Sequence, residues 1–266
     1  MVQIIENMIC VNCGYEKLQS SITQITCFAC GQVFSIKDGI PDMLLEKNAK
    51  DRNIQINVDF YDKNAPLYDK EWAEYEEWQV ELREKFIHHA KSQASVPYIV
   101  ELACGPGRDL EYFNKHGCKM VGADLSYGQL SLAQKKVDVP LFRTDMCSLP
   151  FGSNLFDALW CCVALIHVSR INASKALQQM VRVLKPGGVL FISVLYGEGT
   201  MEVKRKVYNE TPEIYELYKE NEFAKLLNDA GFEIKDTIKR EAFHNRKTSE
   251  ISGGVKTYID IFAIKN

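Results

Sequence analysis

The 266-residue sequence predicts an α/β fold with a mostly parallel sheet, preceded by a small N-terminal module. From residue 97 onward, short apolar runs alternate with helical patterns, and strands that alternate with helices form parallel sheets covered on both faces. A glycine-containing turn follows the first of these runs. Two CxxC motifs fall within the first 45 residues, a stretch too short for much of a hydrophobic core. With 46% apolar residues, the chain can bury one α/β core beside this module.

The N-terminal module contains four cysteines in two pairs separated by thirteen residues: Cys10, Cys13, Cys27 and Cys30. Two such pairs supply four thiolates that can close a tetrahedral zinc site. Because sulfur fills all four positions, we expect the Zn²⁺ to be structural and to supply much of the folding energy of residues 1–45. A redox CxxC is the alternative. We expect the module and the α/β domain to have separate cores.

Residues 46–95 form a linker and a helical segment. Between Asp59 and Ser92, aromatic and aliphatic residues recur three and four positions apart, which predicts one or two amphipathic helices broken at Pro66. The α/β domain then occupies residues 96–266. Its later strands are expected at LFRTD, FDALWCCVA, GVLFISVLY, FEIKDTI and TYIDIFAIK, and its helices at SYGQLSLAQKK, ASKALQQMVRVLK and NEFAKLLNDAG. The short connection between the last two strands favours an antiparallel edge.

The turn ELACGPGRDL joins the first predicted strand, which ends at Glu101, to a helix. Small residues at Ala103, Gly105 and Gly107 let a ligand approach the backbone at the carboxyl end of this strand. The third glycine of a dinucleotide motif is missing, which disfavours a pyrophosphate. Glu101 favours a cationic ligand group such as an α-amino group. A purely structural turn is the alternative.

Two aspartates close the next two predicted strands. Asp124 lies 23 residues after Glu101, where a carboxylate can accept hydrogen bonds from both ribose hydroxyls. Asp145 lies a further 21 residues along and can accept from an exocyclic adenine amine while Met146 packs on the ring. Each aspartate alone could be a helix cap or turn residue. Three acidic strand ends in this order predict a nucleoside cofactor.

These segments resemble the class I S-adenosylmethionine-dependent methyltransferases of the type 11/25-like group. ELACGPG resembles the first motif, GADLS the second, TDMCSLPF the third, FDALWCCVALIHVS the fourth, and RVLKPGGVLFISV the entry to strand five. The resemblance covers roughly residues 59 to 266 and implies a Rossmann-like seven-stranded methyltransferase sheet, with its last strand inserted antiparallel. It implies S-adenosylmethionine as cofactor. The sequence departs from the family at Ala103, where many members have glycine. The residues it places at the cofactor are Glu101, Ala103, Cys104, Gly105, Gly107, Asp124, Leu125, Asp145, Met146 and Cys162.

Methyl transfer from a sulfonium is an in-line displacement, so the protein must mainly align the acceptor and, for some acceptors, remove a proton. His167 in ALIHVS is the candidate general base, and a packed histidine is the alternative reading. Tyr61 and Tyr68 resemble aromatic lid residues of the family, whose ring faces favour a sulfonium cation. A helix face packed on the domain is the alternative for these two tyrosines.

The segment CFACGQVFSIKDGIPDML resembles the Trm112-like zinc ribbons, whose members activate or accompany methyltransferases. We expect a small-molecule acceptor, a metabolite or natural-product intermediate, held under the lid and residues 197–221. An RNA methyltransferase acting on an rRNA or tRNA base is the first alternative, since zinc ribbons precede some rRNA guanine methyltransferases. A non-catalytic scaffold or partner-activating subunit is the second, although such a protein has no need of three acidic strand ends.

The charge of the chain favours a small-molecule acceptor over RNA. The net charge is −3 with pI near 6.0, residues 1–45 hold two Lys against four acidic residues, and residues 59–92 hold five basic against nine acidic. Neither segment offers the basic stripe that phosphate backbones require. The chain starts without a signal-peptide pattern and has no apolar run of the ~18 residues needed to span a bilayer. We therefore expect a cytoplasmic protein without a membrane partner, for which a homodimer is possible.

Overall fold

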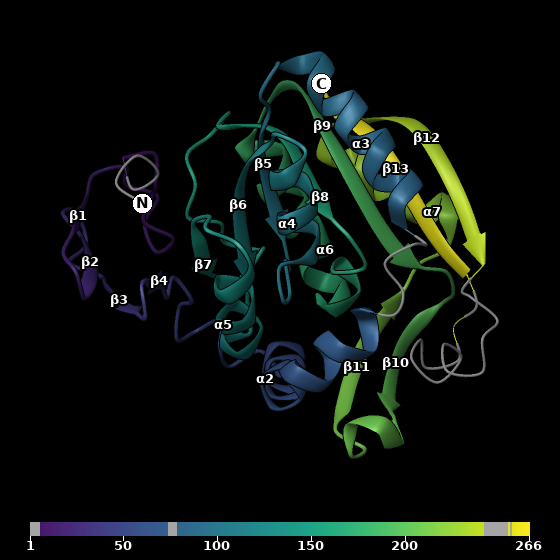
Figure 1. Ribbon diagram of the computed structural model, residues 1–266, viewed down its shortest axis with the longest axis horizontal. Helices are drawn as coiled ribbons and strands as arrows, with labels where there is room; N and C mark the ends of the chain where they lie inside the picture. Colours follow the sequence, from purple (N-terminus) through teal and green to yellow (C-terminus); the bar gives the residue numbers. More distant parts are fainter. Residues whose placement is uncertain (1–5, 74–78, 242–254, 256) are drawn as a thin grey trace.

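The main feature of the structure, a computed structural model that describes residues 6–73, 79–241, 255 and 257–266, is a seven-stranded sheet (Figure 1). Its strand order is β12-β13-β9-β8-β5-β6-β7. Strand β13 pairs antiparallel with both neighbours, and the pairs from β9 to β7 are parallel. The strands are β5 (Tyr98–Leu102), β6 (Lys119–Asp124), β7 (Leu141–Arg143), β8 (Phe156–Cys161), β9 (Leu184–Leu195), β12 (Phe232–Glu241) and β13 (Thr257–Lys265). The predicted Rossmann-like methyltransferase sheet with an inserted antiparallel strand is confirmed.

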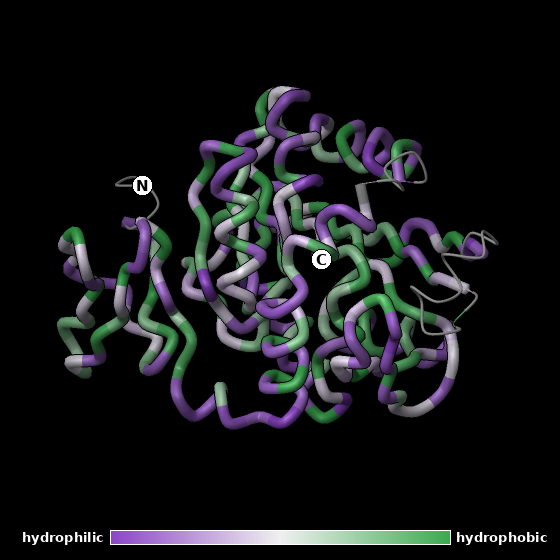
Figure 2. Tube along the Cα trace, turned by 60° about the horizontal axis from the view of Figure 1, so that its bottom comes forward, coloured by the Kyte–Doolittle hydropathy of each residue, from purple (hydrophilic) through white to green (hydrophobic). Residues whose placement is uncertain are grey.

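Helices cover both faces of this sheet. The flanking helices are α3 (Val80–Gln93), α4 (Arg108–Lys115), α5 (Tyr127–Lys136), α6 (Arg170–Val183) and α7 (Glu220–Ala230). Side chains alternate between the faces along a strand, so Ala158 and Trp160 of β8 join the core under α3 to α5, and Leu159 joins the core under α6 and α7. Every residue of β8 is buried, as expected for a parallel strand covered on both sides. Figure 2 shows the apolar stretches of these central strands in green.

The N-terminal module is a four-stranded antiparallel sheet next to the four cysteines, on the side of β7 (Figure 1). Its strands are β1 (Leu18–Ser20), β2 (Gln24–Cys27), β3 (Val33–Lys37) and β4 (Ile40–Pro41). Met8 and Phe34 lie in the same apolar cluster as Phe142 and Phe151 of the large domain. The expectation of two separate cores is therefore wrong, because the module is too small to enclose its own apolar residues and buries them against the sheet edge.

Helix α2 (Arg52–Ala73) runs through Pro66, so the predicted break at that proline is also wrong. A proline inside a helix costs ~3 kcal/mol because it removes a hydrogen bond and crowds the preceding turn. Contacts with α5 hold α2 on both sides of Pro66: Asp62 accepts from the Gly128 amide at 2.8 Å, and Asp69 pairs with Lys136 at 2.5 Å. These tertiary contacts offset the local cost.

Residues 197–221 contain a hairpin that the sequence patterns did not indicate, formed by β10 (Gly199–Lys204) and β11 (Pro212–Leu217). Two 3₁₀ turns accompany it, η2 (Leu165–His167) and η3 (Lys206–Tyr208). Strand β11 contacts both α2 and η2, and Figure 1 shows α2 and the hairpin next to each other below the sheet. Within the described part of the chain, no helix is both long and apolar enough to cross a membrane.

Candidate active site

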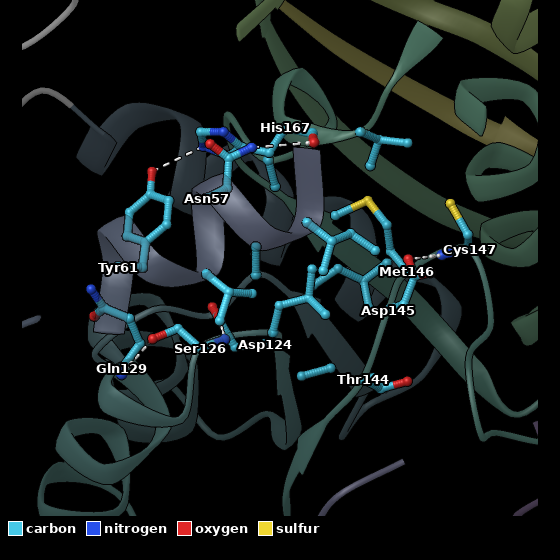
Figure 3. A pocket seen from close by; sticks show the side chains of 18 of the residues that line it. Asn57, Tyr61, Asp124, Ser126, Gln129, Thr144, Asp145, Met146, Cys147 and His167 are labelled. Atoms are coloured by element: carbon cyan, nitrogen blue, oxygen red, sulfur yellow. Dashed lines mark hydrogen bonds between the residues drawn. The ribbon is translucent and has the colours of Figure 1, made fainter. Parts of the chain in front are cut away.

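Two adjoining cavities lie at the carboxyl ends of β5, β6 and β8. We call them the first and the second cavity. Side chains of α2 and of the turn after β8 form part of both, so the helical segment covers the strand ends. Figure 3 shows the first cavity with Tyr61 and His167 joined on one side, Asp145 and Met146 on the other, and Asp124 below. The residues that line both cavities are Tyr61, Tyr68, Ala103, Gly105, Cys162, Val163 and His167.

Asp124 ends β6 and lies in the first cavity, where backbone amides orient its carboxylate. One oxygen accepts from the Gly105 amide and the other from the Ser126 amide, both at 2.8 Å. Burial raises the pKa of Asp124 to about 6. Each carboxylate oxygen has a further lone pair, so the group can accept two more hydrogen bonds, as a vicinal diol requires. Leu125 follows it in the lining.

Asp145 and Met146 line the first cavity beyond β7. One carboxylate oxygen of Asp145 accepts from the Cys147 amide at 2.8 Å. The other accepts from the side-chain amide of Asn48 at 3.0 Å. Asn48 lies 97 positions away in the segment that leaves the N-terminal module, and no sequence pattern had singled it out.

Glu101 lies under the second cavity, 4% exposed, and its Oε2 has no hydrogen-bond partner within the described residues. Burial, reinforced by the charge of Asp109, raises the pKa of Glu101 well above its ordinary value. A buried carboxylate oxygen without a partner is costly unless a ligand supplies one. Gln129, 1% exposed in the first cavity, likewise leaves both side-chain amide atoms unpaired. The two cavities therefore offer polar groups at several points to a ligand.

The turn after β5 follows the cavity floor. Ala103 has φ of +55°, a conformation that costs an alanine roughly 1 kcal/mol more than a glycine, which explains the glycine of many related motifs. Gly105 lines both cavities, and Cys104 lines the second. Gly107 packs against α5 instead, since a Cβ there would meet the Ala133 Cβ at 2.9 Å. Gly107 therefore allows close packing of α4 against α5 and lines neither cavity.

His167 and Tyr61 form a hydrogen-bonded pair, with 2.9 Å between Nε2 and the phenol oxygen (Figure 3). The Nδ1 of His167 lies 3.2 Å from the Ile214 carbonyl, which can only accept, so Nδ1 carries the proton and Nε2 accepts from Tyr61. Burial lowers the pKa of His167 to about 4. The histidine is therefore neutral near pH 7, and its unprotonated nitrogen, Nε2, already accepts a hydrogen bond from Tyr61. Tyr68 packs edge-on against Tyr61, with 5.3 Å between the ring centroids.

Asn57 joins the helical lid to the rest of this site and was also missed from the sequence. Its side-chain oxygen accepts from the Ile214 amide at 2.9 Å, and its amide nitrogen lies 3.4 Å from the carbonyls of Ile214 and His167. In the sequence, Asn57 is one polar residue among the apolar positions of an amphipathic helix, so the hydrophobic pattern does not mark it as a site residue. Nothing in the sequence indicated that residues 57 and 214 would meet.

The second cavity is lined by aromatic rings and two buried ion pairs. Arg205 pairs with Glu213, which also accepts from the Tyr215 phenol at 3.0 Å. Arg83 donates to Asp109 at 2.6 Å, and Asp109 also accepts from the Trp160 indole. The side-chain amide of Gln79 approaches the Cys162 sulfur at 3.0 Å. The aromatic residues of the lining are Tyr61, Tyr68, Trp72, Tyr215 and Tyr258.

The four cysteines of the N-terminal module meet in one cluster, with all four sulfurs within 4.8 Å of one another. The Cys10 and Cys30 sulfurs are 3.7 Å apart, as are those of Cys13 and Cys27. A zinc ion bonded to four sulfurs at ~2.3 Å places them about 3.8 Å apart. The donor set and its spacing therefore fit tetrahedral zinc, with every position taken by protein.

The sheet order is that of the Rossmann-like methyltransferase fold. In agreement, residues 100–192 match the family model described as a methyltransferase domain. The chain is 33% identical over 113 residues to the demethylmenaquinone methyltransferase of Paenarthrobacter aurescens strain TC1, across 42% of this chain and 44% of that protein. It is 28% identical over 108 residues to the malonyl-[acyl-carrier protein] O-methyltransferase of Enterobacter lignolyticus strain SCF1, across 40% and 42%. The match thus spans less than half the length of each relative.

The fold is similar to a solved structure of the 1,6-didemethyltoxoflavin-N1-methyltransferase of Burkholderia thailandensis, with bound 1,6-didemethyltoxoflavin and S-adenosylhomocysteine. The TM-score is 0.53 at 18% identity, and the superposition covers 90% of this chain and 98% of that one. At this identity the likeness concerns the fold alone. It extends beyond the segment matched by the family model.

Proposed function

We propose that this protein is an S-adenosylmethionine-dependent methyltransferase that acts on a small molecule. The observation that carries the proposal is the unpaired Glu101 oxygen in a cavity that joins the one holding Asp124 and Asp145. These three carboxylates lie at or just beyond the carboxyl ends of the successive strands β5, β6 and β7, and their surroundings match the chemical groups of the donor. The curated relatives named above are methyltransferases, which supports the same reaction class.

In this proposal each donor group has a partner in the chain. Asp124 accepts from the ribose hydroxyls, and Asp145 accepts from the adenine amine beside Met146. Glu101 faces the α-ammonium group, and Arg108, which lines the same cavity, supplies a cation for the α-carboxylate. The bound donor supplies a methyl group activated by a sulfonium charge.

The acceptor occupies the second cavity, next to the Tyr61 and His167 pair. A hydroxyl or amine against the Tyr61 oxygen would pass its proton to Tyr61 while Tyr61 passes its own to Nε2 of His167. Because the pKa of His167 is about 4, this base is weak. We therefore propose that alignment of the acceptor by Tyr61, Tyr68 and His167 contributes more than proton removal.

A small molecule fits better than RNA because the acceptor cavity is bordered by the α2 lid and the β10–β11 hairpin. The lining is aromatic, and two of its three arginines are paired with buried carboxylates. The relatives differ in the acceptors that their names give, demethylmenaquinone for one and malonyl-[acyl-carrier protein] for the other. We propose an organic acceptor with aromatic or conjugated character.

We also propose that the cysteine cluster holds one structural Zn²⁺. With four thiolates around the ion, no coordination position is available to a substrate or water. Elemental analysis of protein prepared without chelators should give one zinc per chain, and absence of zinc would contradict this part of the proposal.

The reaction is tested by incubating the purified protein with methyl-labelled donor and, in parallel, a metabolite extract and total RNA. Label in a small molecule supports the proposal, and label in RNA contradicts it.

Ionic strength gives a second distinction between a small-molecule acceptor and RNA. Turnover of a small molecule should change little between about 50 and 200 mM salt, whereas RNA binding through six or more phosphates would fall by ~10³. Donor and demethylated product should both raise the melting temperature, and two flat results would refute donor binding.

A further inference from the structure

The segment that leaves the N-terminal module, residues 40–51, runs along the edge of the donor site, and we call it the exit segment. After β4, Asp42 forms a parallel bridge with Arg143, the last residue of β7. The Met43 amide then donates to the Arg143 carbonyl at 2.8 Å. The exit segment thus continues the large sheet by one short rung. Asp145 follows only two residues after this rung.

Arg143 connects the exit segment to the turn that carries Asp124. Its guanidinium donates to the Asp42 carboxylate at 2.7 Å and, through Nε, to the Leu125 carbonyl at 2.9 Å. The Thr144 amide donates to the Asp124 carbonyl at 2.9 Å. Asp42 therefore fixes the side chain that holds the backbone directly after the ribose-binding aspartate.

Asn48 connects the exit segment to the second aspartate of the donor site. Its side-chain amide donates to Asp145 at 3.0 Å, and its backbone amide donates to Leu45 at 2.9 Å within a turn. Leu45 is buried in the core that the module shares with the large domain. Asn48 is thus anchored on the module side, and it limits the orientations of Asp145.

The cysteine cluster fixes the start of this connection. Cys27 ends β2, which pairs with β3, and β3 pairs with β4 at the beginning of the exit segment. The turn between β3 and β4 also contacts α5, because Gln134 donates to the Asp38 carbonyl at 2.7 Å. A metal that closes the two CxxC pairs restrains β2 and β3, and through them the exit segment.

We propose that Asp42 and Asn48 are positioning residues for the methyl donor, and that metal binding by the four cysteines is thereby coupled to donor affinity. The inference rests on the proposed function, since it requires that the first cavity binds the donor. Coupling between two sites is reciprocal, so the donor must raise metal affinity by the factor by which the metal raises donor affinity.

The first test measures the dissociation constant of S-adenosylhomocysteine by calorimetry for Asp42→Asn and Asn48→Ala, both of which keep all four cysteines. We expect each to bind about tenfold more weakly, because each loses a charge-assisted hydrogen bond that orders the site. Asp229→Asn and Asn228→Ala make the same chemical changes on the exposed face of α7 and should bind as the unaltered chain does. Affinities equal to these controls would overturn the inference, and an unaltered chain that fails to bind would overturn the proposed function as well.

A second measurement separates positioning from general stability. S-inosylhomocysteine carries an oxygen where adenine carries the exocyclic amine, so the unaltered protein should prefer S-adenosylhomocysteine through Asp145. Asn48→Ala should reduce this preference, because Asp145 is then no longer held toward the amine, whereas a merely less stable protein would keep it. An unchanged preference would overturn the role of Asn48.

The coupling itself is measured as the rate at which the protein loses zinc, so the experiment does not depend on methyl transfer. Zinc loss to a chelator should be slower in the presence of saturating S-adenosylhomocysteine, and this protection should be smaller in Asp42→Asn. Identical rates of zinc loss with and without the ligand would overturn the coupling.

Discussion

His167 shows how burial sets the chemistry of a single side chain. Burial lowers its pKa from the ordinary 6.5 to about 4, because a charged imidazole there would lack water. The folded pKa lies below the unfolded one, so between pH 6.5 and 4 the unfolded chain binds more protons. Stability from this group is therefore complete above about pH 6.5 and is lost as the pH falls toward 4.

We predict that His167→Gln removes this part of the acid sensitivity. Relative to the variant, the unaltered protein should lose up to about 3 kcal/mol of unfolding free energy between pH 6.5 and 4, since one pKa unit corresponds to about 1.4 kcal/mol. Denaturant titrations of both proteins at several pH values measure the difference, in which contributions of other groups cancel. A difference that does not vary with pH would show that the histidine is charged or solvated in the fold.

Asp124 has the opposite shift, and it gives a prediction about the donor. Its pKa of about 6 means that the carboxylate, the form that accepts from a ribose, predominates above pH 6. Donor affinity should therefore fall by up to about tenfold per pH unit below 6. Asp124→Asn should bind more weakly and lack this step, whereas Glu101→Gln should bind more weakly and retain it. A step near pH 6 in Asp124→Asn would assign the titration to another group.

At the scale of elements, the sequence predicted the strands and helices of the sheet because each carries a complete apolar pattern. The β10–β11 hairpin was missed because β11 contains the buried charged residue Glu213. Its partner Arg205 follows β10, and such pairing cannot be read from the sequence before the strands are placed side by side. The continuous helix through Pro66 was missed because the contacts of Asp62 and Asp69 with α5 override a local rule.

The contact between α2 and the β10–β11 hairpin gives a prediction about how these two elements hold the acceptor. Asn57→Ala leaves the Ile214 amide without its partner, and an unsatisfied buried amide costs about 1–3 kcal/mol. Since the hairpin and the lid both border the acceptor cavity, we expect a higher KM for the acceptor with little change in donor affinity. Asn64→Ala is the matched control, because among the described residues the side chain of this buried asparagine donates to the Phe60 carbonyl of its own helix and to no other element. Equal kinetics for the two variants would show that the lid does not depend on Asn57.

For the molecule as a whole, the shared core predicts that loss of the metal destabilises the large domain as well as the N-terminal module. Met8, Phe34 and Met43 belong to one apolar cluster with Phe142 and Phe151, so unfolding of residues 1–45 exposes part of the large domain. Cys13→Ser should lower the melting temperature of the whole chain in a single calorimetric transition. Two transitions, with the upper one unshifted, would restore the expectation of separate cores.

The candidate site was predictable to the extent that it lies on strand ends. Glu101, Asp124 and Asp145 follow three apolar runs, and residues after parallel strands meet at one edge of the sheet. Asn48, Asn57 and Gln129 carry no such signal, since Asn57 and Gln129 reach the first cavity from two helices and Asn48 contacts Asp145 from a linker. Their positions depend on how those elements pack, which a one-dimensional pattern does not contain.

The bridge between Met8 and Phe151 and the rung between Asp42 and Arg143 have a consequence for self-association. An open strand at the end of a sheet is a template for a strand of another molecule. The N-terminal module covers this end of the sheet, so a second copy cannot extend it there. At the opposite end, β12 carries alternating charged side chains, including Lys235 and Lys239, which discourage the same kind of pairing. We therefore predict that a homodimer of this chain would not be built by extending the seven-stranded sheet across β7 or β12.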